Sequence, residues 1–210
     1  PDRTSQTEGG TTIRTERESL LQRYEGNPII TPDDVPGSNA VFNCGQTMYH
    51  GKTVLLLSID WDDRPSTVRV ATSQDGFHFD IAQEDFFKPE GTPFEPYSPR
   101  IIDTRVTKIG DTYYIAFPSG GKTIAGMKPC GILAKTTDFK TAELVEIIAL
   151  PKNRVPCLFP EKINGRYCKI DRPGGGPEGP GEMWVSFSPD LIHWGSYRFL
   201  IKPYAKWNML

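Results

Sequence analysis

Residues 107–117, with the sequence TKIGDTYYIAF, are typical of two β-strands joined by a tight turn at Gly110. The same pattern occurs at residues 48–59 around Gly51 and at residues 161–170 around Gly165. The three glycines are separated by 59 and 55 residues. A hairpin that recurs at a nearly constant distance indicates a repeat architecture.

A second element follows each hairpin, with the sequences TSQDGFHF at 72–79, TTDFK at 136–140 and SPDLIHW at 188–194. We expect Asp75, Asp138 and Asp190 to cap turns by accepting backbone N–H bonds, and the aromatic residues after them to pack between repeats. Two hairpins per repeat predict a four-stranded sheet, which is one blade of a β-propeller. The predicted fold is therefore all-β and of propeller type, with about three blades in this chain.

The domain organisation follows from where the repeats begin. Residues 1–26 are polar and predict an N-terminal arm, whereas residues 27–210 predict the propeller domain. Closed propellers have roughly four to eight blades. Three repeats therefore lead us to expect a domain that is incomplete at its C-terminus.

The composition of the chain restricts the classes of molecule that the protein can bind. The net charge of −2 argues against nucleic acid and membrane surfaces, because both require concentrated positive charge. No secretory signal or membrane-spanning run is visible, so we expect a cytoplasmic protein and leave the periplasm open. The four cysteines lack zinc-type spacing and predict free, mostly buried thiols, with a disulfide left open. We expect no metal and no organic cofactor.

Polar residues at the starts of the innermost strands should converge at one mouth of a propeller's central channel. Asp103 stands there between Arg100 and Arg105. The candidate site residues are Asn43, Arg64, Asp103, Arg105, Arg154, Lys162 and Arg172. Arginine suits phosphate or carboxylate because its planar fork donates two parallel hydrogen bonds. On its own, Asn43 is as typical of a turn that satisfies its own backbone. Any one of the arginines, taken alone, is more typical of a solvated side chain or a surface ion pair.

Several motifs carry a resemblance to glycoside hydrolase family 130, the mannoside phosphorylases and related β-mannosidases, from about residue 27 to the end. They are Asn27-Pro28-Ile29, Val41-Phe42-Asn43, Asp103-x-Arg105-Val106-Thr107, Phe159-Pro160-x-Lys162-Ile163-Asn164-Gly165 and Asp190-x-x-x-Trp194. The resemblance implies a five-bladed propeller, of which roughly two blades are absent here. Ile102 and Thr104 depart from the family's acid motif, and residues 171–181 lack a histidine often seen in the family.

The resemblance also implies a role for each candidate. Asp103 matches the general acid, and Asn43 and Arg105 match positions near the mannose subsite. The implied phosphate-binding residues are Arg64, Arg154 and Arg172, with Lys162 nearby.

Inverting glycoside cleavage needs an acid and a nucleophile on opposite faces of the sugar. Water as the nucleophile requires a second carboxylate, whereas inorganic phosphate requires only cations to hold it. One acid with three arginines favours phosphorolysis of a β-mannoside to α-mannose 1-phosphate. The alternatives are a β-mannosidase of the same family and a non-catalytic carbohydrate-binding propeller. The expected partners are a β-mannoside oligosaccharide and phosphate, with self-association left open.

Overall fold

The computed structural model describes residues 22–93, 95, 100–118, 130–174 and 181–202, with the backbone alone at 154 and 155. Most of the predicted arm, residues 1–21, lies outside this range. Within it, the chain forms three four-stranded antiparallel sheets and one short 3-10 helix, η1 (Pro32–Asp34). The all-β prediction is confirmed.

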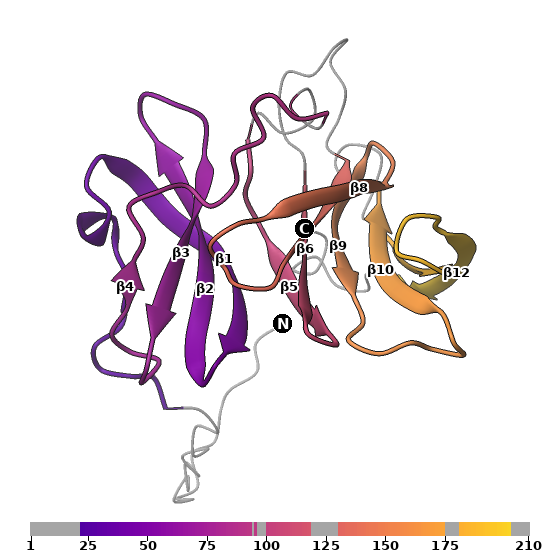
Figure 1. The fold of residues 1–210 in the computed structure, drawn as a ribbon, viewed down its shortest axis with the longest axis horizontal. Helices are drawn as coiled ribbons and strands as arrows, with labels where there is room; N and C mark the ends of the chain where they lie inside the picture. The colour runs from indigo at the N-terminus through magenta and orange to yellow at the C-terminus, as the bar shows by residue number, and fades with distance from the viewer. Residues whose placement is uncertain (1–21, 94, 96–99, 119–129, 175–180, 203–210) are drawn as a thin grey trace, which may run out of the picture.

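Each sheet is a meander in which strands adjacent in sequence are adjacent in space. The first sheet contains β1 (Ser38–Tyr49), β2 (Lys52–Trp61), β3 (Thr67–Ser73) and β4 (Asp80–Ile81). The second contains β5 (Arg105–Ile109), β6 (Thr112–Pro118), β7 (Gly131–Thr136) and β8 (Glu143–Ala149). The third contains β9 (Asn153–Leu158), β10 (Tyr167–Pro173), β11 (Met183–Ser188) and β12 (Gly195–Ile201). Figure 1 shows the sheets side by side, in chain order from indigo to yellow.

The predicted hairpin glycines lie at the turns between the first two strands of each sheet. Gly51, Gly110 and Gly165 have φ values of 76°, 61° and 75°, a left-handed conformation that glycine adopts without a steric penalty. The third turn stands beyond the end of β9 and is closed by an isolated bridge between Ile163 and Arg166. The turns therefore follow the sequence repeat closely.

The three repeat aspartates are turn caps, as predicted. The Oδ1 atom of each accepts two backbone N–H bonds, at 2.8 and 2.9 Å for Asp75, 2.8 and 3.1 Å for Asp138, and 3.0 and 2.9 Å for Asp190. Because these bonds favour the charged carboxylate, the pKa of Asp190 is well below its ordinary value, with the backbone N–H of His193 as the largest cause.

Aromatic residues after two of the caps join neighbouring sheets. Phe139 packs against Tyr49 of the first sheet at a ring-centroid distance of 5.3 Å, and against Phe86 at 6.4 Å. Trp194 packs on an apolar cluster shared by the second and third sheets. In the first copy, Phe79 instead packs against the core of its own sheet. The expected packing between repeats thus holds for the second and third copies.

The four cysteines are free thiols. Cys130 and Cys168 are buried, whereas Cys44 and Cys157 are exposed, so the expectation of mostly buried thiols holds for only half of them. Among the described residues, no helix is long and apolar enough to cross a membrane. The same residues contain no group of three or more His, Cys, Asp or Glu side chains suited to a metal ion.

Candidate active site

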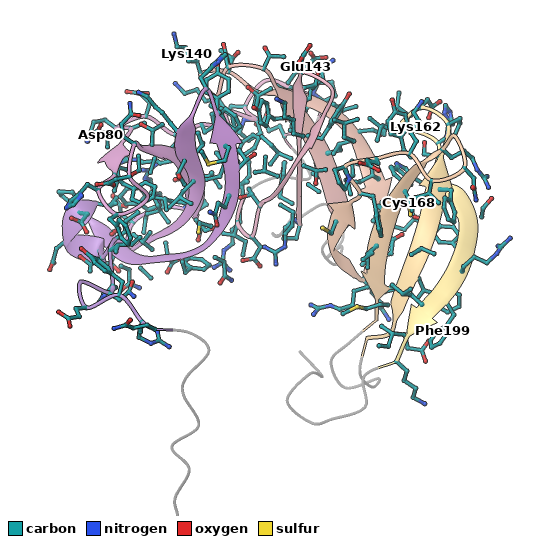
Figure 2. The ribbon with its side chains drawn as sticks, turned by 90° about the horizontal axis from the view of Figure 1, so that it is seen from below. Asp80, Lys140, Glu143, Lys162, Cys168 and Phe199 are labelled. Atoms are coloured by element: carbon teal, nitrogen blue, oxygen red, sulfur yellow. The ribbon has the colours of Figure 1, made fainter. Side chains whose placement is uncertain are left out.

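In each sheet the connections between strands lie at two opposite ends. The end that holds Gly51, Gly110 and Gly165 is called the hairpin end here, and the end where β5 and β9 begin is called the site end. The first strands are neighbours, because β1 contacts β5 and β5 contacts β9. Figure 2 shows Lys140 and Lys162, from hairpin turns, along one edge of the molecule and Phe199 near the opposite edge.

Asn43 and Asp103 meet at the site end, between the first and second sheets. Asn43 Nδ2 donates a hydrogen bond of 2.7 Å to Asp103 Oδ1. Both residues have positive φ, 36° for Asn43 and 54° for Asp103, which is uncommon outside glycine. Asn43 lies at a register shift of β1, between Phe42 and Gly45, and such bulges re-aim side chains.

Ser58 fixes the backbone of both residues. Its hydroxyl accepts a hydrogen bond of 3.0 Å from the Asp103 N–H and donates one of 3.1 Å to the Asn43 carbonyl. Ser58 is fully buried, so this bridge is shielded from water. The orientation of Asp103 therefore depends on a hydroxyl group within β2.

Thr104 ties the entry of β5 to the middle of β1. Its buried hydroxyl accepts a hydrogen bond of 3.2 Å from the Gly45 N–H and donates one of 3.4 Å to the Leu56 carbonyl. A Cβ atom at Gly45 would lie only 2.6 Å from Thr104 Oγ1. The close approach of the two sheets beside Asp103 therefore requires glycine at position 45.

Arg105 and Arg172 share a cavity of about 260 Å³ between the second and third sheets. Its lining consists of Arg105, Cys157, Ile170, Asp171, Arg172 and Met183. Arg105 Nη1 donates to the Thr104 carbonyl at 3.4 Å, which holds this guanidinium beside the strand that follows Asp103. The backbone of Arg154 pairs with that of Arg172 across β9 and β10. A cavity lined by two arginines is a candidate oxyanion site, because the planar guanidinium can donate two parallel hydrogen bonds to an oxyanion.

A buried polar network lies beneath Arg172. Lys169 and Asp171 form an ion pair with each side chain only 1% exposed. Asp171 also accepts hydrogen bonds from Asn153 Nδ2 at 2.9 Å and from Ser186 Oγ at 2.6 Å. Burial lowers the pKa of the Lys169 ammonium, and the neighbouring Asp171 carboxylate opposes this shift.

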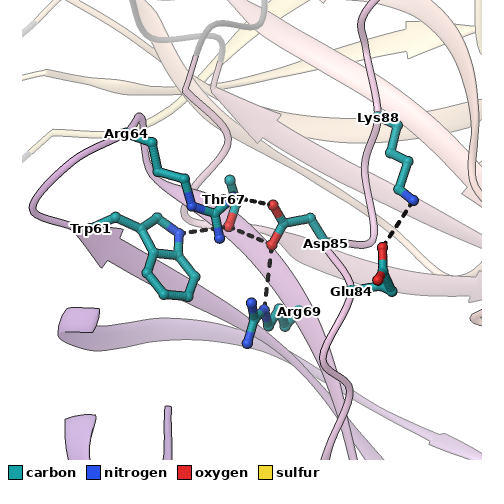
Figure 3. Close-up of polar contacts among 7 residues, drawn as sticks. All are labelled: Trp61, Arg64, Thr67, Arg69, Glu84, Asp85 and Lys88. Carbon is teal, nitrogen blue, oxygen red and sulfur yellow. Dashed lines mark hydrogen bonds and ion pairs between the residues drawn. The ribbon is translucent and has the colours of Figure 1, made fainter. Parts of the chain in front are cut away.

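Arg64 lies in a different environment, shown in Figure 3. Its Nη1 is 2.6 Å from Asp85 Oδ2, and its guanidinium carbon lies 4.0 Å from the centre of the Trp61 ring. Thr67 and Arg69 also bind Asp85, at 2.9 and 3.4 Å. Burial raises the pKa of Asp85, but the bonds from Arg64 and Thr67 outweigh it and lower the pKa overall.

The structure does not place Arg64 in the cavity of Arg105 and Arg172. Arg64 lines a second cavity of about 630 Å³, together with Asp85, Phe87 and Ile101 among others. The expected single cluster of three arginines is thus divided. Arg64 is held by an ion pair and an aromatic ring at the edge of the first sheet.

Lys162 is also separated from the other candidates. It is exposed in the connection between β9 and β10 at the hairpin end, with its ammonium 4.4 Å from the centre of the Tyr167 ring. Asp103 lies at the opposite end of the sheets. The geometry therefore does not support the prediction that Lys162 lies near the phosphate.

Sequence reasoning did not predict the roles of Ser58, Asn153 and Arg100. Ser58 is the only polar side chain in the run 54–59, and that interruption was a usable signal. Asn153 follows a Pro-Lys pair in a loop-like stretch and gave no signal. Arg100, unassigned from the sequence, binds Ser66 at 3.1 Å and lies 3.7 Å from Asp60.

Residues 13–209 match the family model described as beta-1,4-mannooligosaccharide phosphorylase, glycoside hydrolase family 130. The chain belongs to this family. The match confirms the resemblance seen in the motifs, and it covers all the candidate residues.

Two curated relatives show the extent of the similarity. Beta-1,4-mannooligosaccharide phosphorylase from Ruminococcus albus is 33% identical over 202 residues, covering 90% of this chain and 57% of the relative. The 1,2-beta-oligomannan phosphorylase from Thermoanaerobacter sp. is 28% identical over 194 residues, covering 87% and 62%. The chain thus spans about three fifths of the length of these relatives.

A solved family member has the same fold. The structure of beta-1,2-mannobiose phosphorylase from Listeria innocua, in complex with beta-1,2-mannobiose, superimposes with a TM-score of 0.74 at 30% identity. The superposition covers 89% of this chain and 68% of the other. The arrangement of three meandering sheets is therefore shared with this family member.

Proposed function

We propose that this chain belongs to an inverting β-mannoside phosphorylase, which cleaves its substrate with inorganic phosphate and releases α-mannose 1-phosphate. We further propose that the three sheets are blades of a five-bladed propeller. The observation that carries the proposal is the pairing of one oriented carboxylate, Asp103, with a neighbouring cavity lined by Arg105 and Arg172.

In the proposed reaction, an oxygen of phosphate attacks the anomeric carbon while the bond to the glycosidic oxygen breaks. Asp103 gives its proton to the leaving oxygen, directly or through a sugar hydroxyl. The arginines hold the phosphate on the opposite face of the sugar. Because phosphate brings its own negative charge, no second carboxylate is needed as a base.

The neighbours of Asp103 support this role. Asn43 donates to one carboxyl oxygen, so that the other oxygen is available to carry the proton, and Ser58 holds the backbone beneath both residues. We place Asn43 and Arg105 next to the mannose ring. We assign phosphate to Arg105 and Arg172, which line the cavity, and to Arg154, whose backbone pairs with that of Arg172. Arg64 and Lys162 are left out because they do not line this cavity.

Cleavage with and without phosphate tests the proposal. The protein is incubated with β-1,4-mannobiose and, separately, with β-1,2-mannobiose, because the relatives differ in linkage. We expect α-mannose 1-phosphate only when phosphate is present, detected by anion-exchange chromatography. Equal cleavage in both conditions would instead assign a β-mannosidase.

The Asp103→Asn variant separates catalysis from binding. We expect it to lower turnover by about 10²–10⁴-fold, because a general acid contributes on this scale. Circular dichroism and the unfolding midpoint should remain close to those of the unsubstituted protein. Mannoside binding that survives this substitution, in a protein with no turnover at all, would favour a non-catalytic binding propeller.

A further inference from the structure

The cavity proposed for phosphate contains a carboxylate. Asp171 lines it together with Arg105 and Arg172. A free carboxylate at this position would repel a phosphate dianion and would compete with it for the arginines. Any role of the cavity in phosphate binding therefore depends on how Asp171 is held.

Both carboxylate oxygens of Asp171 accept hydrogen bonds from buried side chains. Oδ1 accepts from Lys169 Nζ and from Asn153 Nδ2, and Oδ2 accepts from Ser186 Oγ. Asp171, Lys169 and Ser186 are at most 1% exposed, and Asn153 is 9% exposed. The ammonium of Lys169 balances the carboxylate charge, so that the positive charge of the cavity is retained.

Asn153 makes a second contact, which reaches Arg172 itself. Its Oδ1 accepts a hydrogen bond of 3.0 Å from the backbone N–H of Arg172. The pairing of β9 with β10 shifts register between Ile170 and Arg172, and beyond the shift Arg172 lies opposite Arg154. The side chain of Asn153 therefore links the two strands at the irregularity that places the backbone of Arg172 opposite that of Arg154.

We propose that Asn153 is a positioning residue for phosphate binding. It holds Arg172 at the register shift opposite Arg154, and with Lys169 and Ser186 it keeps the Asp171 carboxylate from competing with the anion. This inference rests on the proposed function, since it concerns the same phosphate site. Asn153 acts through Arg172 and Asp171 and need not touch phosphate.

The Asn153→Ala variant tests the inference by calorimetric titration of the protein with inorganic phosphate and with β-mannobiose. We expect phosphate binding to weaken by about tenfold or more, because Arg172 N–H and Asp171 each lose a buried partner. The affinity for β-mannobiose should change by less than about twofold. Loss of structure alone would weaken both ligands together.

Ser188→Ala is the matched control. Ser188 is a fully buried residue of the same sheet, but it caps the Asp190 turn at the hairpin end. We expect it to lower stability without changing phosphate affinity. If Asn153→Ala binds phosphate as tightly as Ser188→Ala does, the positioning role is overturned.

Two further variants complete the test. Arg172→Ala examines the proposed function itself, and unchanged phosphate affinity in this variant would reject the phosphate site and the positioning role with it. Weakened binding in Arg172→Ala but not in Asn153→Ala would reject the positioning role alone. Ser186→Ala serves if Asn153→Ala does not fold, because it frees Asp171 Oδ2 and leaves the Asn153–Arg172 contact in place. We expect a several-fold loss of phosphate affinity, and no loss would overturn the claim that anchoring Asp171 keeps its carboxylate from competing with phosphate.

Discussion

Replacing Gly45 by alanine would add a single carbon atom beside Asp103. The new Cβ would meet Thr104 Oγ1 at 2.6 Å and the Thr104 carbonyl oxygen at 3.0 Å. To restore an ordinary contact of 3.4 Å, the Thr104 hydroxyl must move by about 0.8 Å. Thr104 resists this displacement because its hydroxyl is hydrogen-bonded to the Leu56 carbonyl.

Two effects should follow from this displacement. Overpacking of this kind costs about 1–3 kcal/mol of unfolding free energy. For a chain of this size, each kcal/mol lowers the melting temperature by roughly 2–4 °C. If Asp103 moves with Thr104, its 2.7 Å bond to Asn43 lengthens to about 3.5 Å, beyond a normal hydrogen bond. A misplacement near 1 Å can cost about 10²-fold in rate.

Gly131→Ala provides a control with a similar steric defect elsewhere. A Cβ at Gly131 would lie 2.8 Å from the Pro156 ring and 2.9 Å from Ala149 Cβ, between β7 and β9. Both variants are compared by urea unfolding and by the rate of phosphate-dependent mannoside cleavage. We expect similar losses of stability but a loss of rate at saturating substrate only in Gly45→Ala. Equal rates in the two variants, or full stability of Gly45→Ala, would refute the argument.

Three other predictions concern separate parts of the molecule. Because the folded-state pKa of Asp190 is lowered, its charge stabilises the fold above the unfolded pKa of about 3.9 and this contribution is lost as the pH falls further. The difference in unfolding free energy between the protein and Asp190→Asn should therefore shrink from pH 7 to pH 3, and a difference independent of pH would contradict this. Iodoacetamide should modify the exposed thiol of Cys157, which lines the cavity, and phosphate should slow this reaction. Phosphate should not slow the modification of the exposed Cys44, and peptide mass spectrometry follows both thiols. Equal protection of both thiols would argue against phosphate in the cavity. Lys169→Met should lower the free energy of unfolding by about 3–5 kcal/mol in urea, because it leaves the buried Asp171 charge uncompensated. The double variant Lys169→Met/Asp171→Leu should recover most of this loss. A double variant as unstable as the single one would show that altered packing, not the unpaired charge, causes the loss.

Local signals in the sequence predicted the repeats well. The turns at Gly51, Gly110 and Gly165 and the cap at Asp190 depend on residues close together in the chain, so their patterns can be recognised without tertiary information. The same repeat also contained the correction for Lys162. Lys162 precedes Gly165 in the turn element, as Lys108 precedes Gly110, and this position predicts the hairpin end.

The buried ion pair shows what the repeat could not predict. Lys169 stands four residues after Gly165, as the buried Leu55 stands four residues after Gly51, and Asp171 likewise corresponds to Leu57. Alternation along a strand predicts apolar side chains at both positions. The charged residues are accommodated by partners from β9 and β11, which the sequence of β10 alone does not reveal.

The position of Arg64 was unpredictable for a related reason. Its ion-pair partner, Asp85, lies 21 residues later in an irregular segment after β4, with no pattern to connect the two. The sequence could place Arg64 in a loop at the correct end of the first sheet. It could not show that the side chain is directed toward Trp61 and Asp85 instead of toward Arg105.

Each sheet is built from one continuous segment of the chain, and this organisation determines which parts of the protein can unfold separately. In proteins of stacked repeats, each unit contacts mainly its neighbours, so one unit can unfold while the others persist. The Asn43–Asp103 contact belongs to the boundary between the first and second sheets, and the arginine cavity to the boundary between the second and third. Amide hydrogen exchange should therefore detect local unfolding at each boundary separately. When urea is added below the global unfolding midpoint, exchange in β10 and β11 should accelerate while β1 and β2 remain protected. The contact at Asp103 and the cavity of Arg105 and Arg172, which we propose as acid and anion site, can thus be lost one at a time.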